Sequence, residues 1–174
     1  MFFFDETILR LLPVLRRSWS RQGEQARVPV SGRNAKRVLY GAMNLRTGHR
    51  IVRTYPTMTQ SFFHDYLGVL RRAYPGRKIL LLLDRAPSPL AQSSLQLAAD
   101  YEMELLWLPK QCPELNAMDQ LWGKAKTAVA ANYQFASVDE LAETFIAWVD
   151  QLSPHQAQFL AGILSPEFWL KRLL

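Results

Sequence analysis

The stretch Lys78–Gln92, KILLLLDRAPSPLAQ, decides the fold class that the sequence predicts. The apolar run from Ile79 to Leu83 is too short for a helix and precedes turn-forming residues, so it predicts a fully buried strand. Pro87 and Pro89 end this strand, because proline donates no backbone hydrogen bond and disfavours helix in the residue before it. Asp84 then lies at the carboxyl end of a central strand, where open α/β sheets usually bind ligands. A turn-forming aspartate is the alternative.

Length and composition predict one compact domain. The chain has 174 residues, of which 49% are hydrophobic and 11% aromatic, enough for a substantial core. No apolar segment approaches the roughly 20 residues that span a bilayer, and the start MFFFDE lacks the basic region of a signal peptide. We therefore expect a cytosolic protein without a membrane partner. Cys112 is the sole cysteine, which excludes an internal disulfide and a cysteine-rich zinc site, and we interpret it as a loop residue.

The net charge of +6 is unevenly distributed along the chain. The segment from Arg10 to Arg53 holds eleven Lys or Arg and one acid, Glu24, so it carries +10 and the remainder carries −4. Five acids and no Lys or Arg lie between Asp139 and Glu167. A basic segment of this kind predicts a surface that binds a polyanion, with phosphate as the obvious group. A solvated basic face is the alternative.

The order of predicted elements indicates an α/β domain with a mixed sheet. Hydrophobic alternation and turn signals predict strands at residues 2–4, 26–30, 37–45, 50–56, 79–83 and 103–109, the last as another buried strand. Helical spacing and capping residues predict helices from Thr59, over 89–101, over 117–132 with Asn116 as its N-cap, from a capping box at Ser137 and Glu140, and after Ser153 and Ser165. Residues 10–34 are otherwise basic and irregular.

Three aspartates occupy comparable places in this order. Asp5 ends the first predicted strand, Asp84 ends the central one, and Asp119 lies in the first turn of the helix after LPKQCPELN. Carboxylates brought together repel one another, so such a cluster normally requires cations, and oxygen ligands without Cys or His favour Mg²⁺ or Mn²⁺. Two such ions can support phosphodiester cleavage. Taken singly, Asp5 as a surface acid beside Glu6 and Asp119 as a favourable first-turn charge are the alternatives.

The motifs around these aspartates resemble the catalytic domain of DDE/DDD transposases, in particular the bacterial insertion-sequence branch of the mariner superfamily. The matching segments are DET at 5–7, LLLLDRAPS at 80–88, LLWLPKQCPELNAMDQLWGKAK at 105–126 and VPVSGRNAKRVLYGAMNLRTGHR at 28–50. In that family 34 residues separate the second and third acids, as they separate Asp84 and Asp119 here. PELNAMD matches the family motif before the third acid, with Ala117 replacing the usual proline.

The resemblance implies a ribonuclease H-like mixed sheet flanked by helices, and a single catalytic domain over residues 1–174. It implies that Asp5, Asp84 and Asp119 are the catalytic residues and the ligands of two Mg²⁺ ions, with Mn²⁺ as a substitute; Glu6 is a neighbour outside the ligand set. It further implies hydrolysis at transposon ends and joining of the freed 3′-hydroxyl to target DNA, typically at TA. A homodimer on DNA belongs to the same expectation.

Three departures from the family pattern bear on this expectation. Arg85 follows the second acid in place of the usual Asn, and Ser88-Pro89 occupy the place where a His commonly lies. Only four residues precede Asp5, where the family has helix-turn-helix modules. We therefore expect a catalytic domain without recognition modules, with DNA recognition supplied by a separate polypeptide. The remaining alternatives are a catalytically silent DNA-binding remnant and a standalone ribonuclease H-like nuclease or resolvase.

The basic segment is predicted to contact DNA through phosphates, which position a protein without reading sequence. Trp19 is predicted to stack on an unpaired base. The predicted DNA-binding residues are Arg16, Arg17, Trp19, Arg33, Lys36, Arg37, Arg85, Lys110 and Lys124.

Overall fold

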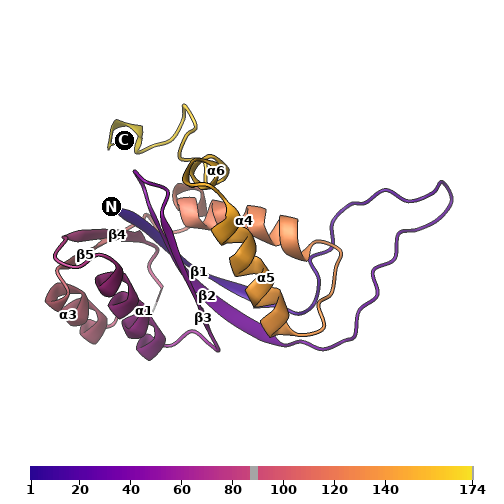
Figure 1. Ribbon diagram of the computed structural model, residues 1–174, viewed down its shortest axis with the longest axis horizontal. Coiled ribbons are helices and arrows are strands. Elements are labelled where there is room, and N and C mark those ends of the chain that lie inside the picture. The colour runs from indigo at the N-terminus through magenta and orange to yellow at the C-terminus, as the bar shows by residue number, and fades with distance from the viewer. Residues whose placement is uncertain (87–89, 174) are drawn as a thin grey trace.

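The structure, a computed structural model, describes residues 1–86 and 90–173. It contains one five-stranded sheet of order β3-β2-β1-β4-β5 (Figure 1). The strands are β1 Phe2–Arg10, β2 Lys36–Asn44, β3 Arg50–Tyr55, β4 Ile79–Leu83 and β5 Met103–Trp107. β1, β2 and β3 pair antiparallel, whereas β4 lies parallel to β1 and β5 parallel to β4. The predicted mixed sheet is confirmed. Pro87, Ser88 and Pro89, on which part of the sequence argument depends, lie outside the described residues.

β1 is longer than the sequence predicts, and Asp5 does not end it. All nine residues of β1 pair with β2, so the backbone bonds of Asp5 and Glu6 belong to the antiparallel ladder whatever their side chains are. Only Phe2 and Phe3 pair with β4. β1 therefore continues past the end of β4, and Asp5 lies beside the place where β4 stops, close to Asp84. The prediction that the first strand ends at Asp5 failed because hydrophobic alternation is weak evidence for a strand once two adjacent polar residues, here Asp5 and Glu6, interrupt it.

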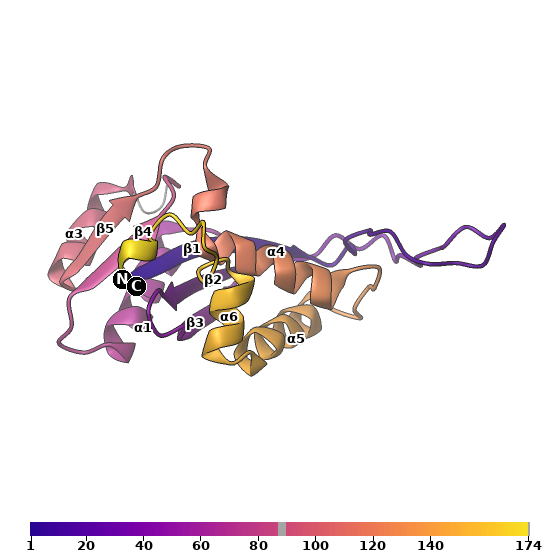
Figure 2. The same cartoon turned by 90° about the horizontal axis from the view of Figure 1, so that it is seen from above.

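Helices cover both faces of the sheet (Figures 1 and 2). One side carries α1 Gln60–Ala73 and α3 Gln92–Asp100, and the other carries α4 Ala117–Ala130, α5 Val138–Gln151 and α6 Pro154–Leu160. Each side has its own apolar core, because successive residues of a strand point to opposite faces. Phe3 packs into the α4 and α5 core, whereas Phe2 and Phe4 pack into the α1 core. The α/β class is confirmed.

Three smaller predictions are wrong. Residues 26–30 form no strand, because they lie in a loop with no neighbouring strand, and Pro29 has no backbone donor. No α-helix follows Ser165 as far as residue 173, the last one described; the chain makes turns there before a short 3₁₀ helix at Lys171–Leu173. β5 is only half-buried, because it is an edge strand with a single neighbour.

The helix starts are closer to prediction. Ser137 accepts a hydrogen bond from the Glu140 N–H, as expected of an N-cap. Glu140 itself accepts from the Ala136 N–H instead of closing the box on Ser137. A complete capping box forms at Ser153 with Gln156, a pair that the sequence analysis did not single out.

Residues 11–35, here called the arm, leave the body between β1 and β2 as a long irregular excursion (Figures 1 and 2). Hydrogen bonds fix its base to the end of α4: Asn132 bonds the backbone of Arg16 through both its amide atoms, at 2.8 and 3.0 Å. Gln134 likewise bonds Ser31. Beyond this base the arm is exposed, as Trp19 shows most clearly. Within the described ranges, no helix is long and apolar enough to cross a membrane.

Gly41 sets the distance between β2 and α4. A Cβ at this position would lie 2.7 Å from Met118 Cε and closer still to the Trp122 indole, both deeply buried. We expect Gly41→Ala to lower the free energy of unfolding by about 1–3 kcal/mol, since an overpacked core must shift side chains or backbone. Chemical denaturation measures this change.

The matched control is Gly123→Ala on α4, where an added Cβ meets nothing within 4 Å. Alanine favours the helix interior by about 1 kcal/mol over glycine, so this variant should be more stable than wild type. Equal effects of the two substitutions would contradict the close packing at Gly41.

Candidate active site

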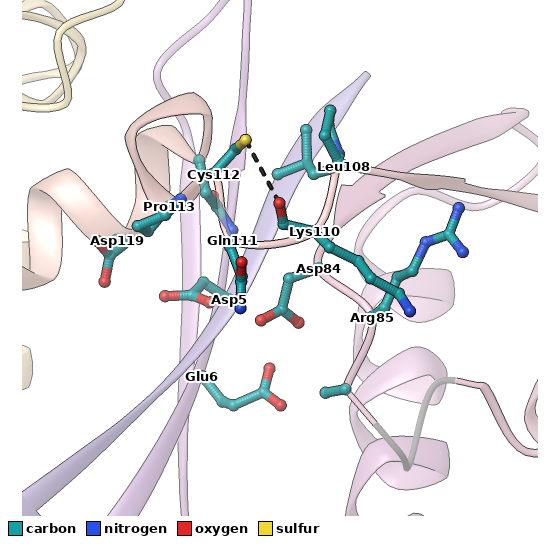
Figure 3. Close-up of a pocket in the computed structure, with 13 residues that line it drawn as sticks. Asp5, Glu6, Asp84, Arg85, Leu108, Lys110, Gln111, Cys112, Pro113 and Asp119 are labelled. Carbon is teal, nitrogen blue, oxygen red and sulfur yellow. Dashed lines mark hydrogen bonds between the residues drawn. The ribbon is translucent and has the colours of Figure 1, made fainter.

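A pocket of about 570 Å³ opens where β4 ends, beside the middle of β1 and the start of α4. Carboxylates, basic side chains and the loop after β5 line it together (Figure 3). The lining residues are Asp5, Glu6, Asp84, Arg85, Ala86, Leu108, Pro109, Lys110, Gln111, Cys112, Pro113, Asn116 and Asp119. The structure thus brings the three predicted aspartates to one pocket, and adds Glu6.

Each of the three aspartates comes from a different element. Asp84 follows the last residue of β4, Asp5 lies within β1, and Asp119 lies in the first turn of α4. Figure 3 shows Asp5 between Asp119 and Asp84, with Glu6 beside them. Arg85 and Lys110 lie on the Asp84 side of the pocket. Cys112 is a loop residue, as predicted, and its thiol bonds the Lys110 carbonyl oxygen.

The buried Asn116 side chain holds two of these acids in relation to each other. Its Nδ2 donates to the Phe4 carbonyl oxygen at 2.9 Å, one residue before Asp5. Its Oδ1 accepts from the Met118 N–H at 3.1 Å, one residue before Asp119. A single amide therefore caps α4 and ties its first turn to β1. The sequence predicts the cap, but the bond to β1 spans 112 residues and has no local signal.

Burial and repulsion by neighbouring carboxylates make the ionised forms of Asp5 and Glu6 unfavourable. Burial raises the pKa of Asp5 to about 9, and the charges of Glu6, Asp119 and Asp84 add to the effect. Burial raises the pKa of Glu6 to about 7, with Asp84 as the second cause. Repulsion of this kind is what a bound cation would relieve.

The donor set suits a hard divalent cation. Four carboxylate side chains line the pocket, and Glu6 Oε2 is buried without a hydrogen-bond partner in the described structure. Within residues 1–86 and 90–173, however, no three acidic, His or Cys side chains are already close enough together to hold a metal ion. The carboxylates gather around one pocket without forming a closed coordination shell, so a cation would have to draw them inward.

Lys126 is a residue that the sequence analysis missed. It lies seven residues, or about two helical turns, after Asp119 on α4, so both side chains share one face of the helix. Burial lowers the pKa of its ammonium, while Asp119 and Asp5 act in the opposite direction. Lys126 is therefore a half-buried cation within electrostatic reach of two of the acids. The signal available in the sequence was this helical spacing.

The predicted DNA-binding residues fall into two groups. Arg85 and Lys110 line the pocket. The others lie away from it: Arg16, Arg17, Trp19 and Arg33 in the arm, Lys36 and Arg37 at the start of β2, and Lys124 exposed on α4. Arg37 is already engaged, because its guanidinium forms two contacts with Asp139, at 2.6 and 3.0 Å.

The sheet order and the place of the acidic pocket define the class of domain, which is ribonuclease H-like as predicted. Solved structures with this fold include a mariner Mos1 paired end complex with Mg, with a TM-score of 0.76 and 19% identity over 98% of this chain and 53% of the other. The catalytic domain of Mos1 mariner transposase gives a TM-score of 0.67 and 17% identity, over 98% of this chain and 78% of the other.

Sequence comparison identifies the family to which the chain belongs within this fold. The family described as DDE superfamily endonuclease matches residues 1–142, and the chain belongs to it. A curated relative, the "Insertion element IS630 uncharacterized 39 kDa protein" of Shigella sonnei, is 26% identical over 158 residues. The match covers 88% of this chain and 46% of that relative, so the chain spans about half the length of the relative. The predicted insertion-sequence and mariner branch is confirmed.

The raised pKa of Asp5 predicts how stability depends on pH without metal. The folded protein holds this proton up to about pH 9, whereas the unfolded chain releases it near the ordinary value of 3.8, so stability falls as pH rises between the two values. Asp5→Asn removes the contribution of Asp5 to this dependence and leaves the smaller contribution of Glu6. Near pH 8 we expect the free energy of unfolding of the metal-free variant to exceed that of wild type by at least about 1–2 kcal/mol, which raises Tm by at least about 2–8 °C.

Thermal melts in EDTA across this pH range provide the measurement. Asp100→Asn, which changes an exposed acid at the end of α3, is the control and should keep the wild-type profile. An Asp5→Asn profile that parallels wild type would mean that Asp5 ionises normally in the folded state.

The Asn116 clamp yields a second prediction. Asn116→Ala removes the cap of α4 and leaves the Phe4 carbonyl oxygen without its donor, so we expect a loss of about 2–4 kcal/mol in the free energy of unfolding. Ser137→Ala removes only the cap of α5 and should cost about 1 kcal/mol. Urea unfolding of both variants measures the difference, and equal losses would show that the bond to Phe4 adds nothing.

Proposed function

We propose that this chain is a metal-dependent catalytic domain that cleaves phosphodiester bonds in DNA and joins a freed 3′-hydroxyl to target DNA. Asp5, Asp84 and Asp119 are the proposed catalytic residues and metal ligands, and residues 1–174 act as one catalytic domain. The observation that carries this proposal is the acidic pocket: carboxylates from three elements line one hollow, and the pKa of the half-buried Asp5 is raised by desolvation and further by its acidic neighbours. Membership of an endonuclease family supports the same reaction.

Asp5, Asp84 and Asp119 would hold divalent cations, which would supply positive charge to stabilise the oxygens of the scissile phosphate. Mg²⁺ is the proposed ion, with Mn²⁺ as a substitute and two ions per site. The relatives of known structure include Mos1 complexes with Mg and with Mn.

The chain's own residues would divide the remaining work. Arg85 and Lys110, at the edge of the pocket, would bind phosphate oxygens beside the scissile bond and hold the strand in place. Asn116 would keep Asp119 at a fixed separation from Asp5. Glu6 Oε2, buried and free to accept, would take a hydrogen bond from a water at the pocket edge without serving as a metal ligand.

The biological substrate would be transposon ends and target DNA. Relatives include Mos1 complexes with a transposon end, and the relative from Shigella sonnei belongs to an insertion element. DNA-end recognition by another polypeptide, a homodimer on DNA, and action in the bacterial cytosol or nucleoid complete the proposal. The chain spans about half of the Mos1 chains in these complexes, so these whole-protein properties extend beyond the part described here.

The arm would add affinity without sequence recognition. Its basic residues and the fully exposed Trp19 suit phosphate contacts and base stacking. Its base lies at the end of α4 away from Asp119, about 18 Å along the helix, which corresponds to about five base pairs of duplex. Duplex binding by an Arg17→Gln/Arg33→Gln variant at several salt concentrations tests this role, and an unchanged salt dependence would exclude it.

Cleavage of a supercoiled plasmid tests the proposed reaction. With Mg²⁺ or Mn²⁺ the wild type should nick the plasmid, and Asp84→Asn should lower the rate by about 10²–10³-fold, the scale of removing one electrostatic stabiliser. Asp100→Asn, an exposed acid outside the pocket, should retain the wild-type rate.

The alternatives give different outcomes in the same experiment. A silent DNA-binding remnant would bind the plasmid without nicking it under either metal. A standalone nuclease would nick the plasmid but fail to join an oligonucleotide with a free 3′-hydroxyl to it. Nicking that Asp84→Asn leaves intact would mean that the acidic pocket is not the active site.

A further inference from the structure

A second hollow, of about 510 Å³, lies at the open edge of the sheet. β3 is the edge strand, and α1 and α5 border it on opposite faces of the sheet (Figure 2). β3 and α1 supply most of the lining, and α5 supplies Asp150. The lining residues are His49, Arg50, Ile51, Val52, Arg53, Val69, Arg72, Ala73 and Asp150. None of them lines the acidic pocket.

The charge of this hollow is positive. Arg50, Arg53 and Arg72 face it together with a single carboxylate, Asp150. The ion pairs found within the described ranges join Arg37 to Asp139, Arg71 to Glu102 and Lys78 to Glu104, so none of them neutralises the three arginines of the hollow. Three guanidinium groups in one concave site are a typical arrangement for binding phosphate oxygens.

Arg50 is held in place before any ligand arrives. Its Nη1 donates to the Gly48 carbonyl oxygen at 3.0 Å and its Nη2 to the Leu152 carbonyl oxygen at 2.7 Å. Its Nε is buried and has no hydrogen-bond partner in the described structure. Burial lowers the pKa of this guanidinium, while Asp150 acts in the opposite direction. A fixed, partly desolvated cation favours an anionic ligand, because little side-chain entropy remains to be lost on binding.

Arg53 and Arg72 complete the site from two elements. Arg53 lies on β3 and donates to the carbonyl oxygen of Val52, its own neighbour at the sheet edge, at 2.8 Å. Arg72 lies exposed in the last turn of α1. Within the described residues, Arg53 Nη1 makes the one hydrogen bond found for these two guanidinium groups, so both groups have N–H donors available for a ligand.

We propose that this hollow is a second phosphate-binding site, which holds the backbone of a DNA segment outside the catalytic pocket. The site goes beyond the proposed cleavage, because it shares no residue with the acidic pocket and needs no metal. Its function would be to anchor DNA while the pocket acts on another part of the same or a second duplex. The competing explanation is that the arginines protect an edge strand from pairing with another chain.

The salt dependence of duplex binding separates these explanations. Each phosphate contact adds about 0.9 to the slope of log affinity against log salt. We expect Arg53→Gln/Arg72→Gln to lower that slope by about 2 and the affinity at low salt by about tenfold, measured by fluorescence anisotropy in EDTA. Arg50 stays unchanged, because its bonds to Gly48 and Leu152 are structural.

The matched control is Arg77→Gln/Arg172→Gln, which removes the same charge from exposed positions outside both hollows. This variant should keep the wild-type slope. If both double variants lower the slope equally, the hollow is part of a diffuse positive surface and the proposal is wrong. If neither lowers it, the arginines only protect the edge.

A measurement on the wild type removes any dependence on variant folding. Phenylglyoxal modifies accessible arginines, and mass spectrometry should show that duplex DNA protects Arg53 and Arg72 but leaves Arg77 and Arg172 reactive. Pyrophosphate provides the second arm and should protect the same pair at higher concentration, since it offers the same oxygens. Protection by pyrophosphate with none by DNA would assign the hollow to a free polyphosphate and overturn the proposal.

Discussion

The two hydrogen bonds of the Asn116 side chain are the constraint on which the acidic pocket depends. One bond reaches β1 beside Asp5 and the other opens α4 beside Asp119, so a single buried amide fixes the distance between two elements far apart in sequence. Asp84 needs no such clamp, because the parallel pairing of β4 with β1 already brings it beside Asp5. The sheet register and one side chain thus place all three aspartates. An amide serves here where an acid would fail, since the Phe4 carbonyl oxygen requires a donor.

The acids that the pocket would need for its chemistry lower the stability of the fold. The interior of β1 would be more stable with neutral side chains, yet two adjacent positions carry acids that burial and repulsion push toward protonation. Lys126, itself partly desolvated, offsets only some of that repulsion from the α4 side. The apolar cores on both faces of the sheet stabilise the fold and compensate for the destabilising effect of these acids. A bound cation would remove the conflict, because its charge stabilises the ionised carboxylates.

The sequence predicts the features that depend on interactions between residues close together in the chain. The run Ile79–Leu83, the amphipathic helix after Thr59 and the cap at Asn116 are local patterns, and each appears where it was expected. The true length of β1 was missed because pairing with β2 determines it, and that partner begins at Lys36. Lys126 and the Phe4 bond were missed for the same reason: each depends on a partner brought close only by the fold. The motifs around Asp5, Asp84 and Asp119 supplied the long-range information that periodicity lacks.

The arm is a place where the chain could be cleaved into two fragments that stay associated. Its tip, a turn near Gly23 closed by the Glu24 N–H bond to the Arg21 carbonyl oxygen, is exposed and far from the body, as preferred sites of proteolysis are. A cut there would leave β1 on a short peptide, still paired with β2 along all nine residues and packed into both cores. The central strand, and Asp5 with it, would then be bound as a separate fragment. The two pieces could therefore be produced apart and mixed, so that one carboxylate of the pocket is delivered or withheld at will.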